Sequence, residues 1–288
     1  MSKKTLVCIH VMPNELEMFQ RFMERYRIAL FHAKEYDVTI KATLNLNPTL
    51  TDWDKSELKQ DYFMEKFTNE FAYKGMKNIN QIILDDSVRG TTAQKRESIK
   101  IDYFDQFIFV DSDIALHEHQ LLYQLRASEK LDGKYIISPS IPKWWDSSWD
   151  YLVGEGLGET PALVKETLEK VYTQVPTKLI MKQIPTIKFG CGMHTLYSKD
   201  FWKFIGIPES LGGYGPEDTI AMMRALVAIK MGHDIKQFVL DGIFITEDVI
   251  NREPSFKDKI VSITNKDQQA KKGKELITQE VTNFMESL

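Results

Sequence analysis

The chain has 288 residues, of which 43% are hydrophobic and 27% are charged, and this is about twice the length of an ordinary domain. The composition excludes an intrinsically disordered chain and predicts a folded protein with a sizeable core, in one large domain or two ordinary ones. A formal net charge of −4 argues against a global positive field that would hold the protein on nucleic acid or an anionic membrane, and it leaves a local basic patch open.

The cysteines and the first residues bear on the compartment. Cys8 and Cys191 lack the spacing of a disulfide framework or a zinc site, which favours a reducing environment. The first apolar run ends at Met12, before Pro13 and Asn14, and is too short for a signal peptide. No segment approaches the roughly 18 apolar residues of a membrane span. We therefore expect a cytoplasmic protein with no integral membrane segment.

The first half of the chain alternates strand and helix patterns. A nearly all-apolar run from Thr5 to Met12 predicts a strand buried on both faces. Asn14, with Glu17 three residues later, predicts a capping box that opens a helix extending to about residue 36. In VTIKATLNLN apolar residues alternate with Thr, Lys and Asn, which predicts a half-buried strand. The next predicted elements are helices at 55–75, 91–103 and 117–131, and strands at 80–84, 106–110 and 134–141.

This alternation predicts right-handed βαβ units, and therefore an α/β fold with a mostly parallel sheet and helices on both faces. The second half is less regular. Its predicted elements are helices at about 161–173, 216–231 and 262–288, and strands near 184–189 and 235–248. Ligands of such sheets bind at the carboxyl ends of the strands, so polar residues at these ends are candidates for a functional site.

Two aspartates follow the fourth predicted strand. Asp111 and Asp113, in FIFVDSDI, come directly after a buried run, where charged side chains are costly unless they bind something. Two carboxylates at one strand end can converge on a hard divalent cation. The alternative is that they only cap a loop.

A second acidic pair follows a glycine-rich loop. Gly212, Gly213 and Gly215 allow the backbone to approach a ligand closely, and Glu217 and Asp218 then fall in the first turn of a helix. A carboxylate there can accept a proton from a bound hydroxyl. The alternative is ordinary capping of the helix.

Four segments in this order carry a family resemblance: MPNE, GTTAQKRESI, FVDSD and GGYGPEDT. Over residues 4–250 the chain resembles GT-A-fold nucleotide-sugar glycosyltransferases, most closely family-2-like members, with a Gly-Pro-Glu-Asp motif of the galactosyltransferase type. The resemblance implies a GT-A (Rossmann-like) domain at 1–250 and a helical tail at 251–288. Within the domain it implies a nucleotide-sugar-binding half at 1–115 and an acceptor-binding, catalytic half at 116–250.

The resemblance also implies roles for particular residues. Asp111 and Asp113 would hold Mn²⁺ or Mg²⁺ on the donor diphosphate, Glu217 would orient the acceptor, and Asp218 would be the base of an inverting displacement. The donor, expected to be a UDP-sugar, would be bound by His10, Met12, Asn45, Lys95, Arg96 and Ser112. The acceptor would be bound by Trp144, Trp145, Gly213 and Tyr214, although the tryptophans are as consistent with packing of a surface loop.

Some positions depart from the family pattern. Ser98 replaces a glycine, and Asn45 and Asn47 end the second predicted strand where many relatives place an Asp that meets the nucleotide base. Relatives often supply a histidine as a further metal ligand after the Glu-Asp pair, and here Asp241 is the candidate replacement, with Glu247, Asp248 or water as alternatives. His194 is expected either to line the pocket or to be a hydrogen-bonded core residue.

Other functions compete with glycosyl transfer to a glycan. The same chemistry could act on a hydroxylated DNA base. Basic clusters such as Lys95, Arg96 and Lys100 favour this alternative, because they could contact DNA. A non-catalytic carbohydrate-binding protein could use the tryptophan-rich loop. A dehydrogenase is disfavoured because no GxGxxG follows a strand, and a nucleotidyltransferase because no Gly-rich, Arg-containing loop follows the first strand.

Overall fold

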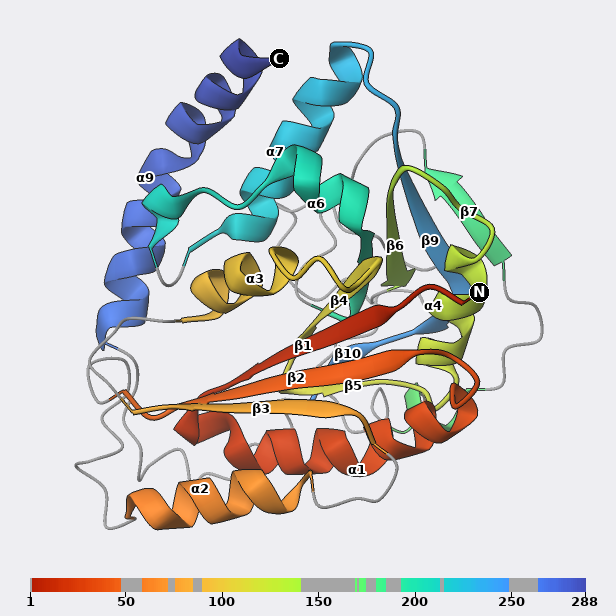
Figure 1. Ribbon diagram of the computed structural model, residues 1–288, viewed down its shortest axis with the longest axis vertical. Coiled ribbons are helices and arrows are strands. Elements are labelled where there is room, and N and C mark those ends of the chain that lie inside the picture. Colours follow the sequence, from red (N-terminus) through yellow and green to blue (C-terminus); the bar gives the residue numbers. More distant parts are fainter. Residues whose placement is uncertain are drawn as a thin grey trace.

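The structure is a computed structural model that describes residues 2–47, 59–71, 76–84, 90–140, 169, 171–174, 180–184, 193–212, 215–248 and 264–288. Its centre is an eight-stranded sheet with the order β3-β2-β1-β4-β8-β6-β9-β7 (Figure 1). The strands are β1 (Thr5–Val11), β2 (Val38–Asn45), β3 (Asn78–Ile83), β4 (Gln106–Asp111), β6 (Lys134–Ser140), β7 (Ile180–Ile184), β8 (Thr195–Ser198) and β9 (Ile235–Phe244). Only β7 and β8 run against the direction shared by the other six strands of this sheet.

Helices cover both faces of the sheet (Figure 1). One face carries α1 (Leu16–His32), α2 (Gln60–Asn69) and α4 (Gln120–Ser128), and the other carries α3 (Thr91–Ile99), α6 (Lys199–Ile205), α7 (Glu217–Lys230) and α9 (Thr264–Ser287). Short 3-10 turns occur at η1 (Pro13–Glu15) and η3 (Glu209–Leu211), and β5 (Ile114–Ala115) pairs with β10 (Thr246–Glu247) in a separate small sheet. The expected fold class is confirmed: an α/β protein with a mostly parallel central sheet, flanking helices and a C-terminal helix.

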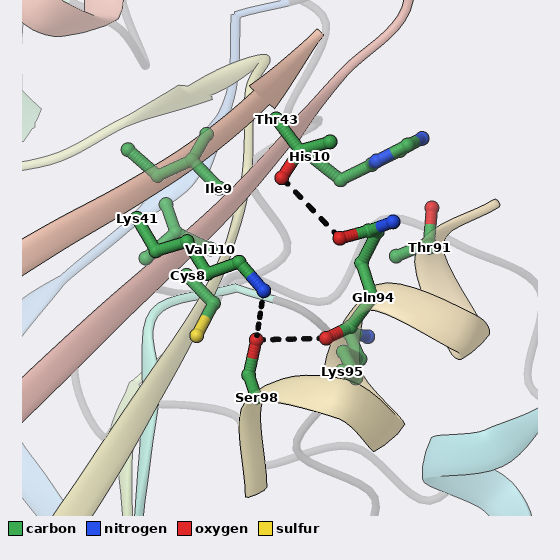
Figure 2. Close-up of a pocket in the computed structure, with 10 residues that line it drawn as sticks. All are labelled: Cys8, Ile9, His10, Lys41, Thr43, Thr91, Gln94, Lys95, Ser98 and Val110. Carbon is green, nitrogen blue, oxygen red and sulfur yellow. Dashed lines mark hydrogen bonds between the residues drawn. The ribbon is translucent and has the colours of Figure 1, made fainter. Parts of the chain in front are cut away.

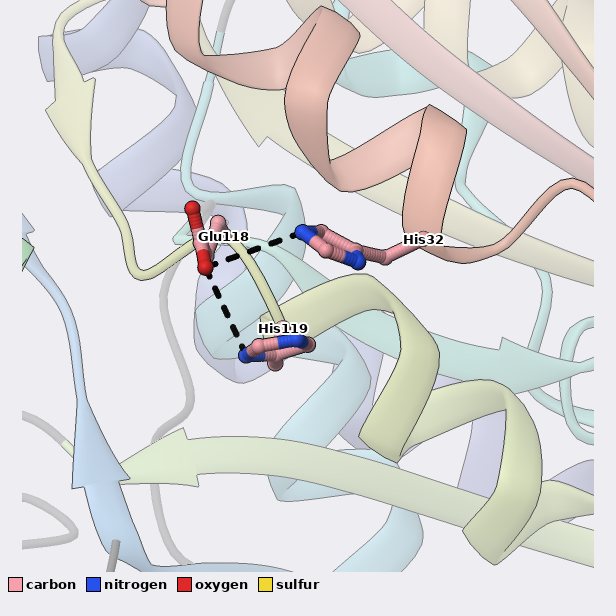
Figure 3. Close-up of side chains that lie close together, drawn as sticks. All are labelled: His32, Glu118 and His119. Carbon is pink, nitrogen blue, oxygen red and sulfur yellow. Dashed lines mark ion pairs between the residues drawn. The ribbon is translucent and has the colours of Figure 1, made fainter. Parts of the chain in front are cut away.

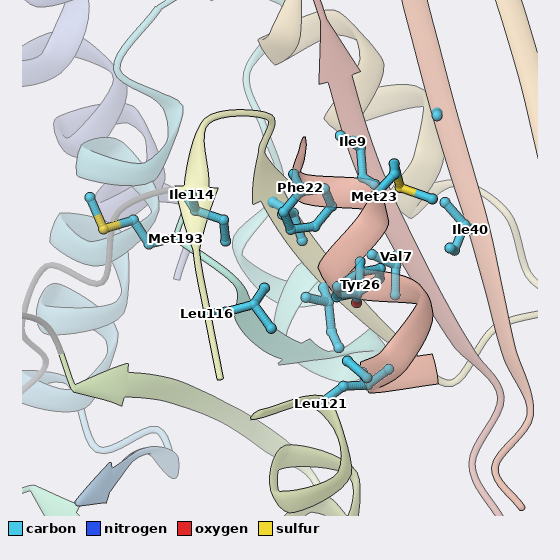
Figure 4. Packing of buried hydrophobic residues seen from close by; sticks show 14 of the residues in the cluster. Val7, Ile9, Phe22, Met23, Tyr26, Ile40, Ile114, Leu116, Leu121 and Met193 are labelled. Atoms are coloured by element: carbon cyan, nitrogen blue, oxygen red, sulfur yellow. The ribbon is translucent and has the colours of Figure 1, made fainter. Parts of the chain in front are cut away.

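Each face of the sheet has its own apolar core. Val7 and Ile9 of β1 pack with Phe22 and Tyr26 of α1 on one side (Figure 4). Leu6 points to the opposite side, into a second cluster that contains residues of β4, α6 and α7. The alternation along β1 therefore holds both helical layers on the sheet. Among the described helices, none is long and apolar enough to cross a membrane.

The predicted capping box at Asn14 is wrong. The chain first forms the 3-10 turn η1, so Asn14 lies inside that turn and α1 begins at Leu16 with Glu15 as its N-cap residue. The carboxylate of Glu15 accepts a hydrogen bond from the backbone N–H of Met12 at 3.3 Å. The acid that organises this turn is therefore Glu15, two residues before Glu17.

The prediction that β2 is half-buried is also wrong. Its polar residues Lys41, Thr43 and Asn45 are all buried. Helix α3 covers this face with polar side chains of its own: Lys41 Nζ donates to Ser98 Oγ at 3.2 Å, and Thr43 Oγ1 donates to Gln94 Oε1 at 3.4 Å (Figure 2). The alternating pattern thus marks a buried polar layer and not a face open to solvent.

Candidate active site

The first part of the site is a row of polar residues at the carboxyl edge of the sheet. His10 of β1 is in register with Thr43 of β2 and with Asp111 of β4. Residues in register on parallel strands point to the same face, which here is the face covered by α3. Asp111 is the last residue of β4, and Ser112 and Asp113 follow it where the chain turns.

The second part is the first turn of α7. Pro216 is its N-cap residue, and Glu217 and Asp218 open the helix. Glu217 is buried, and both of its carboxylate oxygens are engaged by α3: Oε2 accepts from Thr92 Oγ1 at 2.9 Å, and Oε1 pairs with Lys95 Nζ. Helix α3 therefore fixes the position of this turn.

Lys95 joins the two parts of the site. Burial alone would lower the pKa of the Lys95 ammonium, but the charges of Glu217, Asp218 and Asp111 outweigh it, and the pKa is raised above its ordinary value. Lys95 therefore lies among carboxylates from both acidic segments. The structure brings together the two pairs that the sequence placed about a hundred residues apart.

The carboxylates of the site disfavour one another's ionisation. Burial, together with Asp113, Asp218 and Glu15, raises the pKa of Asp111 to about 7, although Lys95 opposes the shift. Burial and the neighbouring Glu217 raise the pKa of Asp218 to about 6, again against Lys95. Carboxylate oxygens gathered in this way are the donors that a hard divalent cation prefers. Asp111 and Asp113 could hold such an ion.

The structure does not bring Asp241 to these aspartates. The strand registers place Ile108 of β4 and Phe238 of β9 in one row, separated by β8 and β6. Asp111 and Asp241 each lie three residues further along, so roughly 14 Å of sheet separates them. Asp241 Oδ2 instead accepts a hydrogen bond from Lys182 Nζ at 2.7 Å.

Asp248, which follows β10, lies next to the acidic pair Asp111 and Asp113. The pairing of β10 with β5 brings the chain next to the turn at residues 111–113, here called the acidic turn. There the backbone N–H of Asp248 donates to the carbonyl of Asp113 at 2.5 Å. Asp248 is buried, and its carboxylate is 3.3 Å from Arg21 Nε. Asp248, one of the acids considered as replacements for a histidine ligand, is thus placed beside Asp113.

Glu15 is a site residue that the sequence reasoning missed. Besides the N–H of Met12, its Oε2 accepts a hydrogen bond from Ser112 Oγ at 3.0 Å. It therefore ties the end of β1 to the acidic turn after β4, and its charge contributes to the raised pKa of Asp111. The MPNE segment could have indicated Glu15, because an acid shortly after a buried strand is the same pattern that predicted a site at Asp111.

Two residues predicted to bind the donor form hydrogen bonds to the backbone of loops in this structure. Asn45 Oδ1 accepts from the N–H of Asn47 at 2.9 Å, which turns the chain at the end of β2. The guanidinium of Arg96 donates to the carbonyls of Pro208 at 2.6 Å and Gly212 at 3.1 Å. Arg96 therefore fixes the start of the glycine-rich loop.

His194 is a core residue. It is fully buried, its Nε2 lies 3.0 Å from the Tyr26 hydroxyl, and its Nδ1 lies 2.5 Å from Gln124 Oε1. Burial lowers the pKa of His194 to about 3, so the ring is neutral. The acceptor residues predicted at Trp144, Trp145, Gly213 and Tyr214 lie outside the described residues.

A small cavity lies beneath the site, between β1, β2 and α3 (Figure 2). Its volume is about 10 Å³, which is room for about one water molecule and not for a nucleotide. Within the described residues, Nε2 of the buried Gln94, which lines it, has no hydrogen-bond partner.

Comparison with known proteins gives similarities of overall fold. No protein-family model matches the chain, and no match is found among curated proteins. S. aureus TarS is similar over 84% of this chain, with a TM-score of 0.48 and 14% sequence identity, and the chain covers 36% of that protein. The structure of TarS 1–349 in complex with UDP-GlcNAc is similar over 84% of this chain and 57% of that one, with a TM-score of 0.47 and 14% identity.

A mycobacterial protein is similar over 85% of this chain and 67% of its own, with a TM-score of 0.45 and 10% identity. The chain thus spans about a third of the TarS chain, 36% of its length. At TM-scores below 0.5 these similarities assign neither a family nor an activity to the chain.

Proposed function

We propose that the protein is a metal-dependent, inverting glycosyltransferase that moves a sugar from a nucleotide-sugar donor to a hydroxyl acceptor. The observation that carries the proposal is the meeting of Asp111 and Asp218 around Lys95 at the carboxyl edge of the sheet. That edge is where α/β sheets bind their ligands. Transfer from a nucleoside diphosphate is accelerated by positive charge near the leaving phosphates and by a carboxylate near the acceptor hydroxyl.

Asp111 and Asp113 are the residues that would hold Mn²⁺ or Mg²⁺ on the donor diphosphate. When bound, such an ion supplies positive charge to the phosphate oxygens on which negative charge develops. Lys95 supplies a further fixed positive charge in the same place. Its ammonium stays protonated at neutral pH, because the surrounding carboxylates raise its pKa.

Asp218 is the proposed general base. The acceptor hydroxyl oxygen forms a bond to the anomeric carbon, the bond from that carbon to the diphosphate oxygen breaks, and the hydroxyl proton passes to Asp218. With a pKa of about 6 the carboxylate is ionised at neutral pH, and it is a stronger base than an ordinary aspartate. The N–H of Thr219 donates to Asp218 Oδ1 at 2.8 Å, which orients the carboxylate.

Glu217 takes a positioning role in this proposal. The family resemblance implies that it orients the acceptor, but both of its oxygens are occupied by Thr92 and Lys95. Through these contacts it holds the first turn of α7, and with it Asp218, against α3. The acceptor is a glycan hydroxyl in the first instance, with a hydroxylated DNA base as the second candidate.

Release of nucleoside diphosphate from a panel of sugar nucleotides, with and without Mn²⁺, tests the proposal. The panel includes UDP-GlcNAc, the compound named in one TarS complex. Slow hydrolysis of the correct donor needs no known acceptor, and DNA with hydroxylated bases is added in a separate arm. We expect Mn²⁺-stimulated release by the unchanged protein and a loss of about 10²–10⁴-fold in Asp218→Asn with donor affinity retained.

Asp200→Asn is the matched control, because Asp200 is an exposed acid in the first turn of α6 and is expected to leave release unchanged. Normal release by Asp218→Asn would contradict the role of that residue. Donor or glycan binding that survives Asp111→Ala, with no release from any donor, would indicate the non-catalytic binding protein.

A further inference from the structure

A second group of metal-ligating side chains lies at the other end of α1. His32, the last residue of that helix, faces Glu118 and His119, which precede α4 (Figure 3). His32 Nε2 is 3.6 Å from Glu118 Oε1, and His119 Nδ1 is 3.9 Å from the same oxygen. Helix α1 has 17 residues, a length of about 25 Å, which separates this group from Glu15 and the acidic turn.

The three side chains are spaced closely enough to share one metal ion. One ligand atom from each lies within 4.8 Å of the other two. Three atoms so spaced leave a point no more than about 2.8 Å from each, while bonds from zinc to nitrogen or oxygen are about 2.0–2.2 Å. Each side chain therefore needs to move by less than about 1 Å to close on an ion.

The surroundings hold His119 in place. The neighbouring His117 is buried, and its Nδ1 accepts a hydrogen bond from the N–H of His119 at 3.2 Å. Its ring also interacts with the backbone of Gln174, so His117 supports the group and is not counted as a ligand. The side chains of His32, Glu118 and His119 are 29%, 46% and 30% exposed, so an ion can reach them from solvent.

We propose that His32, Glu118 and His119 bind a divalent transition-metal ion, with Zn²⁺ as the preferred ion. Two imidazoles and one carboxylate suit zinc, cobalt or nickel, whereas Mg²⁺ and Ca²⁺ prefer sites made entirely of oxygen. The fourth position is open to water. The ion links the end of α1 to the start of α4, two helices that pack against each other on one face of the sheet. It does not depend on the proposed activity at the opposite end of α1.

Cobalt titration of the full-length, metal-free protein without a histidine tag tests the site, because four-coordinate Co²⁺ absorbs visible light. Excess Mg²⁺ is present to occupy sites made of carboxylates, including Asp111 and Asp113. We expect one equivalent of Co²⁺ to bind with visible absorption, to be displaced by Zn²⁺, and to raise the thermal midpoint of unfolding. His32→Gln and Glu118→Gln should each weaken binding at least about tenfold.

Two variants serve as controls. His233→Gln removes a histidine that packs on Phe204, 4.8 Å between ring centroids, and should leave Co²⁺ binding unchanged. Asp111→Asn should also leave it unchanged, which separates this site from the proposed catalytic one. Glu118 is exposed, so Glu118→Gln is expected to fold even where His32→Gln does not. The proposal is overturned if no Co²⁺ or Zn²⁺ binds at stoichiometric concentrations, if Glu118→Gln binds as tightly as the unchanged protein, or if binding is lost in Asp111→Asn.

Discussion

Lys95 of α3 and Glu217 of α7 form a buried ion pair that fastens the first turn of α7 to the sheet-covering helix. Each residue is less than a tenth exposed, 8% for Lys95 and 6% for Glu217. The pair therefore sets the position of Asp218 relative to Asp111, and it also couples the stability of the fold to the geometry of the site.

Removing only one charge of this pair should be strongly destabilising. Lys95→Met leaves the Glu217 carboxylate buried without its partner. We expect the free energy of unfolding, measured in denaturant, to fall by about 3–5 kcal/mol. The double variant Lys95→Met with Glu217→Gln should recover most of that loss, because the Glu217 charge is removed together with its partner. Lys100→Met, which removes the exposed 3.6 Å pair with Glu209, is the control and should cost less than about 1 kcal/mol. A double variant as unstable as Lys95→Met would contradict this account.

The rate of donor turnover should rise with pH between about 5 and 8. Asp218, with a pKa of about 6, must be ionised to accept the proton, and Asp111, with a pKa of about 7, must be ionised to hold a cation. Both pKa values are raised, so protonation at low pH removes the base and the ligand together. At higher Mn²⁺ concentration the ion competes with the proton on Asp111, and the rise should move to lower pH. Initial rates across this range at two Mn²⁺ concentrations measure the effect, and a rate that falls as pH rises would rule out Asp218 as the base.

Asp111 should lower the stability of the protein in the absence of metal. Its pKa in the folded protein is raised to about 7, so the folded state binds the proton more tightly than the unfolded chain does. The contribution of Asp111 to the free energy of unfolding therefore falls as pH rises from about 4 to about 7, and this loss is complete above that range. In EDTA at pH 8 we expect Asp111→Asn to be more stable than the unchanged protein by about 1–3 kcal/mol, and the difference should vanish towards pH 4.

Mg²⁺, which prefers sites made entirely of oxygen, separates this effect from simple repacking. It should raise the thermal midpoint of the unchanged protein and have little effect on Asp111→Asn, because an ion that binds only the folded state stabilises it. A variant that is less stable than the unchanged protein at pH 8 in EDTA would show that the Asp111 carboxylate is not disfavoured there.

The parts of the fold that the sequence predicts are those with local patterns of burial. β1 and β4 are runs of apolar residues covered on both sides, and the acids at Asp111 and Asp113 stand out because they end such a run. α7 is predicted by Pro216 and by the glycine at 232, whose φ of +93° closes the helix. Charged residues that end an apolar run are therefore the local pattern from which the candidate site is predicted.

The parts that it does not predict depend on long-range contacts. β8 has only four residues, Thr195–Ser198, and its place between β4 and β6 is set by hydrogen bonds to those two strands. Lys41 and Thr43 look solvent-facing until α3 covers them with Gln94 and Ser98. Glu15 is close to its partner Ser112 in space and distant in sequence. No local pattern contains these pairings.

The C-terminal helix contacts Gly215 and Pro216, which lead into the acidic pair at the start of α7. A Cβ atom added at Gly273 of α9 would lie 2.5 Å from Cδ of Pro216 and 3.3 Å from Cα of Gly215. The proline ring is rigid, so Gly273→Ala must displace α9 or the start of α7. We expect a loss of about 1–3 kcal/mol of stability from this overpacking, and a lower turnover because Pro216 precedes Glu217 and Asp218.

The sign of the change in stability distinguishes contact between α9 and residues 215–216 from its absence. If α9 did not touch the loop, alanine would stabilise the helix by roughly 0.8–1 kcal/mol relative to glycine. Lys274→Ala changes the next, exposed residue of the same helix and should be nearly neutral in both measurements. Denaturant unfolding and donor turnover of the two variants decide the matter: a stabilised Gly273→Ala with normal turnover would mean that α9 does not bear on the catalytic loop.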